Sequence, residues 1–144
     1  MTDADHHRKL ERLYAHAPVT QWYGASIAIS DGEAEVRFKV KPEFHHSAGA
    51  VHGSVYFRAF DDAAFFAVNS RVREVFVLTV SFTVHLTRPV RAGEMKATGR
   101  VVHGGGRLFV AESTLVNDAG EVLGHGSGVF TRSSIALEPG IGCA

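Results

Sequence analysis

The stretch GSVYFRAFDDAAFFAVN at residues 53–69 decides the fold of this chain. Nearly all of it is apolar or small and it contains no proline, so it predicts a helix. A helix that is apolar around most of its circumference is buried rather than lying on a surface. At about 100° per residue its polar side chains fall in one narrow stripe, formed by Ser54, Arg58, Asp61, Asp62 and Asn69. We therefore expect a central helix surrounded by other elements.

The segments on either side of this helix have the alternation typical of β-strands. Residues 25–40 alternate around Asp31-Gly32, which predicts a hairpin. Four segments rich in β-branched and aromatic residues follow the helix, and turn residues separate them: 75–86, 94–103, 108–116 and 122–131. Before the hairpin, the spacing of apolar residues in 5–16 predicts a short surface helix that ends before Pro18.

These elements predict an α+β fold with one antiparallel sheet, because the connections between strands have hairpin length. A curved sheet of about six strands wrapped around the central helix is the arrangement that buries residues 53–69. With 144 residues the chain fits one domain. We expect an N-terminal helix and lead-in at 1–21, the domain at 22–134 and a C-terminal tail at 135–144.

Composition restricts the classes of partner. Lysine plus arginine number 15, as do aspartate plus glutamate, so no net field attracts nucleic acid and we expect none as a partner. The only cysteine, Cys143, allows no intramolecular disulfide and no cysteine-based metal site. The first residues lack the apolar run of a signal peptide and no stretch is long enough to span a membrane. We expect a cytoplasmic protein with no membrane partner.

A set of motifs carries a family resemblance. The stretch HHSAGAVHGS at 45–54 is followed by Phe60-Asp61, and Gly24, Gly32 and PVRAG at 89–93 complete the pattern. Over residues 22–132 it resembles the hotdog-fold acyl-CoA thioesterases of the phenylacetate-degradation (PaaI) and 4-hydroxybenzoyl-CoA thioesterase type. The chain departs from that pattern twice, with His46 in place of an asparagine and Ser54 in place of the second glycine of His-Gly-Gly.

The resemblance implies a hotdog fold and hydrolysis of acyl-CoA or aryl-CoA thioesters to free acid and CoA, without a cofactor. It implies that the Gly53 amide polarises the thioester carbonyl and that His52 helps to shape the site. His46 would donate a hydrogen bond to the thioester in place of the family's asparagine. Asp61 would be the general base or the nucleophile, and Thr79 would assist the water.

The residues themselves leave alternatives open. The Gly53 amide should be an unsatisfied donor at the positive end of the helix dipole, but a glycine there also eases a tight turn into a helix. A carboxylate at Asp61 is costly in an apolar helix unless it is paired, and Arg58 can pair with Asp61 or with Asp62. Asp62 is therefore a second candidate for the catalytic carboxylate. Thr79 also fits simple β-propensity.

The spacing of Gly53 and Asp61 predicts an assembly. Eight residues of helix span about 12 Å, whereas a reacting carbon lies about 3–3.5 Å from its partners. The two groups can cooperate only from two helices that run past each other in opposite directions, which predicts a homodimer with two equivalent sites. Ser54 and Arg58 would then line an interface cleft. We also expect these dimers to pair into a homotetramer.

The remaining candidates concern the substrate. Phe57 and Phe65 suit an aromatic ring or an alkyl tail equally, and Arg88 and Arg91 could contact the phosphates of coenzyme A, although solvated loop charges fit them too. The histidine spacing matches no metal motif, so we expect no metal. Two other functions stay open: a non-catalytic acyl-CoA-binding or regulatory hotdog domain, and a hotdog dehydratase.

Overall fold

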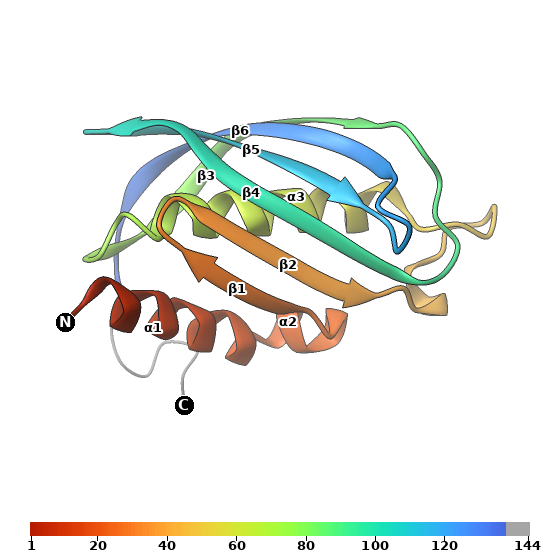
Figure 1. The fold of residues 1–144 in the computed structure, drawn as a ribbon, viewed down its shortest axis with the longest axis horizontal. Helices are drawn as coiled ribbons and strands as arrows, with labels where there is room; N and C mark the ends of the chain where they lie inside the picture. The colour runs from red at the N-terminus through yellow and green to blue at the C-terminus, as the bar shows by residue number, and fades with distance from the viewer. Residues whose placement is uncertain (138–144) are drawn as a thin grey trace.

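The computed structural model describes residues 1–137. One sheet of six strands curves around one long helix, α3 (Figure 1). The strand order is β1-β2-β4-β5-β6-β3, and every neighbouring pair is antiparallel. This confirms the predicted α+β fold, in which an antiparallel sheet wraps around a central buried helix.

The elements lie close to their predicted positions. The helices are α1 (Asp3–His16), α2 (Pro18–Tyr23), a 3-10 turn (Pro42–Phe44) and α3 (Gly53–Asn69). The strands are β1 (Ser26–Ser30), β2 (Glu33–Lys39), β3 (Val75–Leu86), β4 (Glu94–Gly105), β5 (Leu108–Val116) and β6 (Val122–Ala136). Two residues of the predicted tail, 135 and 136, therefore belong to β6, and Cys143 lies outside the described residues.

Helix α3 fills the hollow of the sheet because its side chains there are small or aromatic. Ala63, Ala64 and Ala67 are completely buried, as is Phe60. Gly99 lets β4 lie directly on this helix, since a Cβ at that position would stand 2.4 Å from the backbone of Ala63. Close packing of this kind holds the polar residues of α3 in fixed positions.

The glycines of β6 make room for an aromatic side chain of β3. A Cβ at Gly126 or Gly128 would lie 2.4 Å from the ring of Phe82. Glycine at these two positions therefore allows close approach between neighbouring elements. Phe82 in turn meets Phe57 of α3 edge to face, with ring centroids 5.7 Å apart.

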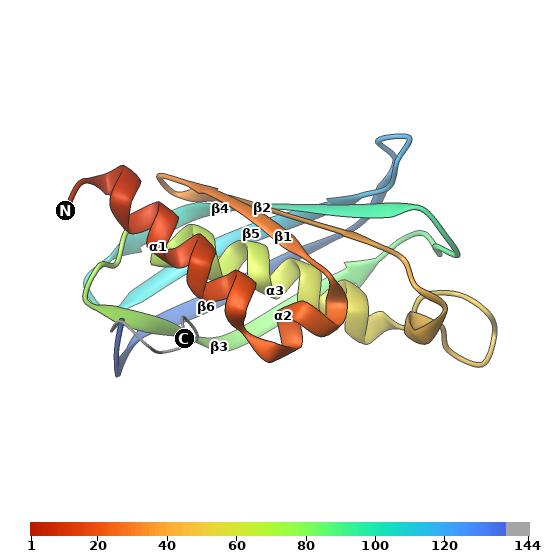
Figure 2. The ribbon, with the colours of Figure 1, turned by 90° about the horizontal axis from the view of Figure 1, so that it is seen from below.

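The two N-terminal helices cover the side of α3 that the sheet leaves open (Figure 2). Leu10, Leu13 and Tyr14 form the buried face of α1. The first helix ends at His16, before Pro18 as predicted, and Pro18 then begins a second helix that the sequence did not indicate. Proline suits the first position of a helix, where its missing N–H costs no hydrogen bond.

Two histidine side chains connect the start of α1 to the end of α3 by hydrogen bonds. The Nε2 atoms of His6 and His7 lie 2.8 and 3.3 Å from the carbonyl oxygens of Asn69 and Ser70, to which they donate. These carbonyls are among those that a helix end leaves unsatisfied. None of the helices within residues 1–137 is both long and apolar enough to cross a membrane.

Candidate active site

Asp61 and Thr79 form the first half of the candidate site. The Thr79 hydroxyl donates to Oδ1 of Asp61 at 2.8 Å. Thr79 lies at an irregularity of β3, where the register against β6 shifts between Thr79 and Ser81. Bulges of this kind change the direction in which a side chain points and are frequent beside active sites. The structure thus brings together two predicted site residues from different elements.

The environment of Asp61 makes its carboxylate more basic than usual. Burial raises the pKa of Asp61 above its ordinary value, while the Thr79 hydrogen bond and the charge of Arg58 act in the opposite direction. A general base works best when its pKa approaches the working pH. Asp61 therefore has the character that water activation requires.

The N-terminus of α3 forms the second half. His52 is the N-cap residue, and its Nδ1 accepts a hydrogen bond from the Ser54 amide at 3.0 Å and lies 2.8 Å from the Ser54 hydroxyl. Gly53 is the first residue of the helix, and within residues 1–137 its amide donates to no acceptor. A free N–H at the positive end of a helix dipole is suited to bind a carbonyl oxygen that gains negative charge.

The loop before α3 holds His46 near His52, the N-cap residue of the helix. Nδ1 of His46 accepts a hydrogen bond from the Ala48 amide at 3.0 Å, and its ring centroid lies 6.4 Å from that of His52. An Nδ1 that accepts carries no proton, so in neutral His46 the proton is on Nε2. The neutral ring can therefore donate from Nε2, as the resemblance implies for this position.

Arg58 pairs with Asp62 rather than with Asp61. Arg58 Nε lies 3.1 Å from Asp62 Oδ2, which is ion-pair distance, although the N–H does not point at that oxygen and Nε makes no hydrogen bond within the described residues. The Tyr14 hydroxyl donates to the same Asp62 oxygen at 2.8 Å, and Arg58 Nη2 donates to the Thr20 hydroxyl at 3.2 Å. Asp62 thus belongs to a polar network with the N-terminal helices.

The protonation of Asp62 differs from that of an ordinary carboxyl group. Burial raises the pKa of Asp62 to about 6, against the opposing effects of Arg58 and Tyr14. A carboxylate that serves as general base needs an oxygen that can accept a proton from water. Because Asp62 is engaged by Arg58 and Tyr14, and Asp61 by one hydroxyl alone within the described residues, Asp61 is the better placed carboxylate.

The two halves of the site lie at different points along α3. Thr79 of β3 is beside Asp61, whereas Leu86 at the end of β3 is beside Gly53, where its Cδ1 would lie 3.2 Å from an added Cβ. Eight residues of helix separate the carboxylate from the amide by about 12 Å. One protomer therefore contains the two halves without joining them.

The other predicted substrate contacts divide between these regions. Arg91 donates to the Gly49 carbonyl at 3.1 Å, and Arg88 forms an exposed ion pair with Glu121 at 3.4 Å. Both arginines lie at the end of the molecule where α3 begins. The Tyr56 hydroxyl in the first turn of α3 donates to the Arg88 carbonyl, and Gly49, which Arg91 contacts, lies in the loop before the helix. Phe57 is 40% exposed on α3.

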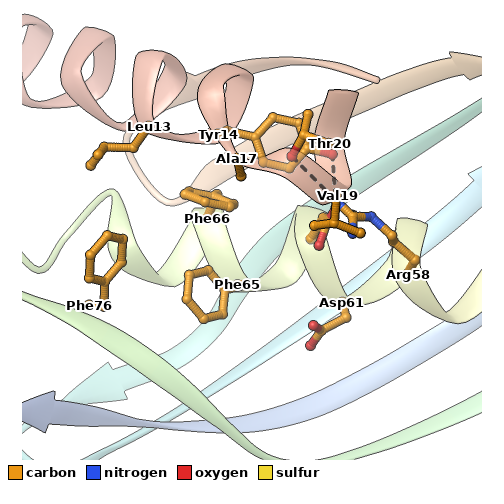
Figure 3. Close-up of a pocket in the computed structure, with 11 residues that line it drawn as sticks. Leu13, Tyr14, Ala17, Val19, Thr20, Arg58, Asp61, Phe65, Phe66 and Phe76 are labelled. Atoms are coloured by element: carbon orange, nitrogen blue, oxygen red, sulfur yellow. Dashed lines mark hydrogen bonds and ion pairs between the residues drawn. The ribbon is translucent and has the colours of Figure 1, made fainter. Parts of the chain in front are cut away.

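A cavity of about 300 Å³ lies beside Asp61 (Figure 3). The N-terminal helices, α3 and the beginning of β3 line it, and Phe65 is one of its walls. The sequence did not indicate this cavity, because contacts between α1 and α3 leave no local pattern. The apolar spacing of Leu10, Leu13 and Tyr14 was the only signal that α1 covers something.

Within residues 1–137 no three histidine, cysteine, aspartate or glutamate side chains are close enough together to hold a metal ion. Asn69, the last polar residue of the α3 stripe, has a structural role. Its side-chain amide donates to the carbonyls of Val72 and Val75 and accepts from the Val77 amide. It fixes the connection between α3 and β3 and lies outside the site.

Comparison with known proteins gives the family. The sequence profile of the thioesterase superfamily matches residues 48–123, just over half of the chain. The PaaI protein of the E. coli phenylacetic acid degradation operon superimposes with a TM-score of 0.85, at 22% identity over 94% of this chain and 99% of that one. A thioesterase from Haemophilus influenzae gives a TM-score of 0.79, at 18% identity over 93% of each chain.

A third solved structure, a variant of PaaI from Thermus thermophilus, gives a TM-score of 0.74 at 24% identity over 81% of this chain and all of that one. No curated protein sequence matches the chain. At these identities the solved structures show the fold alone, and the superfamily profile shows the family. The chain therefore belongs to the thioesterase superfamily and has its hotdog fold.

Proposed function

We propose that the protein is an acyl-CoA thioesterase that hydrolyses its substrate without a cofactor. Membership of the thioesterase superfamily supports thioester hydrolysis in general. The observation that carries the specific proposal is Asp61, a half-buried carboxylate with a raised pKa that one hydroxyl orients beside a cavity. We infer a CoA ester because Arg88 and Arg91 lie at the end of the molecule where α3 begins, and arginine binds phosphate well.

The proposed reaction assigns a role to each group. The Gly53 amide, helped by Nε2 of His46, binds the thioester oxygen, and His52 fixes the helix start that presents this amide. Asp61, oriented by Thr79, takes a proton from water while the water oxygen attacks the thioester carbon. The C–S bond then breaks, and the CoA sulfur leaves as a thiolate that takes up the proton. The products are the free acid and CoA.

The proposed active unit is a homodimer, and the position of Phe57 supports it. Phe57 lies midway between Gly53 and Asp61 on α3 and is 40% exposed. A two-fold axis at Phe57, with the two helices antiparallel, would bring Gly53 of each protomer to Asp61 of its partner. Because each interface contact then occurs twice, the dimer would have two equivalent sites.

The edge strand β3 supports the same axis. Phe82, which contacts Phe57, lies about midway between Thr79 and Leu86, so an axis there would also exchange the ends of β3. Strand β3 is at the edge of the sheet, and Leu78, Val80 and Leu86 are 47%, 59% and 46% exposed. A long apolar edge strand is a template for pairing with another chain. Pairing of two such dimers into a tetramer stays a prediction.

The alternative function is a non-catalytic acyl-CoA-binding domain, which is favoured by the two departures from the family pattern, His46 and Ser54. The Arg58–Asp62 ion pair argues against this alternative, because it leaves Asp61 free of a cation at contact distance among the described residues. Asp61→Asn should lower hydrolysis of CoA thioesters by about 10²–10⁴-fold, the contribution typical of a general base. Asp62→Asn is the matched comparison and should cost far less.

The assay is steady-state release of CoA from a panel of acyl-CoA and aryl-CoA thioesters, with circular dichroism to show that both variants are folded. Near-normal turnover by folded Asp61→Asn would contradict the proposal. If the unmodified protein binds the thioesters but hydrolyses none of them, the binding-domain alternative is correct.

A further inference from the structure

We propose that the cavity beneath the N-terminal helices holds the acyl group of the substrate, and that α1 and α2 decide which acyl groups are accepted. This inference rests on the proposed function, since Asp61, the proposed general base, is also one of the residues that line the cavity. Asp61 lines the cavity together with residues of α1, α2, α3 and β3. An acyl group whose carbonyl carbon lies near Asp61 can enter the cavity directly.

The cavity extends from Asp61 toward the C-terminal end of α3. Figure 3 shows Phe65 between Asp61 and Phe76, with Leu13 of α1 above Phe76. Phe65 is one helical turn beyond Asp61, so both side chains are on the same face of α3. The walls away from the carboxylate are thus aromatic and aliphatic, and they favour an apolar occupant.

The charges around the cavity are paired with each other, which excludes a charged acyl group. Arg58 and Asp62 form an ion pair, and the hydroxyls of Tyr14 and Thr20 bond to them. No further charged residue apart from Asp61 lines the cavity. A carboxylate or ammonium at the far end of an acyl chain would lose its water without gaining a partner, which is strongly unfavourable.

The size of the cavity sets the class of acyl group. An apolar protein cavity of about 150 Å³ is enough to hold benzene, and this cavity has about twice that volume, 300 Å³. It fits an aromatic ring with a short linker, or an alkyl chain of comparable bulk. The chemical class is therefore an uncharged apolar acyl group well above acetyl in size.

The N-terminal helices are fixed to the turn of α3 that carries Asp61. Tyr14 of α1 bonds to Asp62, the residue after Asp61, and Thr20 of α2 bonds to Arg58. Ala17 joins the two helices and lines the cavity between these contacts. Because α1 and α2 are held at these two points, their side chains have a defined position relative to the Asp61 carboxylate. A larger side chain at Ala17 must therefore occupy cavity volume.

The test is Ala17→Phe, which fills the cavity, compared with Ala15→Phe on the exposed face of α1. The measured quantity is the ratio of kcat/KM for octanoyl-CoA, and separately for phenylacetyl-CoA, to kcat/KM for acetyl-CoA. Each buried methylene contributes about fourfold to binding, so in Ala17→Phe the ratio should fall at least tenfold for both acyl groups. Ala15→Phe should keep the ratio of the unmodified protein.

Ala17→Phe and Ala15→Phe giving the same ratios would overturn the inference. Should Ala17→Phe fail to fold, Val19→Trp serves instead, because Val19 lines the cavity and is 49% exposed. Failure of the proposed function gives a different result, namely no turnover of any thioester by the unmodified protein. In that case the cavity assignment is tested by NMR, from the chemical shifts of the Leu13 and Val19 methyl groups with and without octanoate. Shifts that change on addition of octanoate support the assignment, and unchanged shifts refute it.

Discussion

The role of the Gly53 amide can be isolated by replacing Gly53 with proline. Proline deletes the N–H, and the first position of a helix accepts proline without loss of an internal hydrogen bond. His52 already has φ −65° and ψ 144°, the extended conformation that a residue before proline requires. Gly53 has no positive φ, and its amide donates to no acceptor within residues 1–137, so the folded protein should tolerate the change.

Gly53→Ala is the control, because it retains the amide and adds the same Cβ. That Cβ would lie 3.2 Å from Leu86 Cδ1 in either variant, so the difference between the variants isolates the N–H. Loss of one oxyanion donor costs about 10²–10³ in kcat, or about 2.7–4 kcal/mol. We expect Gly53→Pro to release CoA that much more slowly than Gly53→Ala under saturating acyl-CoA. Equal rates would refute the role of this amide.

Three further outcomes are expected. Thr79→Val removes a hydrogen bond that lowers the pKa of Asp61, so the acid limb of the pH profile of kcat/KM should move to higher pH. Thr79→Ser keeps the hydroxyl and should leave the acid limb at its original pH. An acid limb that does not move in Thr79→Val would contradict the role of Thr79. Asp62 has a pKa of about 6 when folded against 3.8 when unfolded, so the native state binds more protons in that interval and stability should fall by about 2 kcal/mol as pH rises from 4 to 6. Urea unfolding should show this loss, and an equal pH slope in Asp62→Asn would exclude Asp62 as its source. Phe57→Asp places two like charges at the proposed two-fold axis, so sedimentation should give monomers with no hydrolysis, whereas an active dimer would exclude the axis at Phe57.

The central helix could be predicted from sequence because its apolar residues surround the polar stripe almost completely. The hairpin before it was equally clear, since Asp31-Gly32 interrupts two alternating runs. The pairing of β3 with β6 could not be predicted in the same way, because the two strands are far apart in sequence and no turn connects them. That pairing matters for function, since it leaves β3 at the edge of the sheet.

The site was only partly visible in the sequence. Asp61 and Asp62 are neighbours in one stripe, and helical periodicity could not decide which of them pairs with Arg58. Packing decides it, because α1 and α2 approach α3 on the side of Asp62 and bring Tyr14 and Thr20, while β3 approaches Asp61 and brings Thr79. The irregularity of β3 at Thr79 has no signal in the residues themselves.

Mixing two inactive variants measures whether each site is built from two chains. Asp61→Asn lacks the base and Gly53→Pro lacks the amide, so in a mixed dimer one of the two sites has both groups intact. Unfolding and refolding an equal mixture makes half of the dimers mixed, and these should recover about one quarter of the normal CoA release under random pairing of equivalent sites. Native mass spectrometry can show whether mixed dimers form. If they form but remain as inactive as either parent variant, that result would contradict a site shared between the two partners.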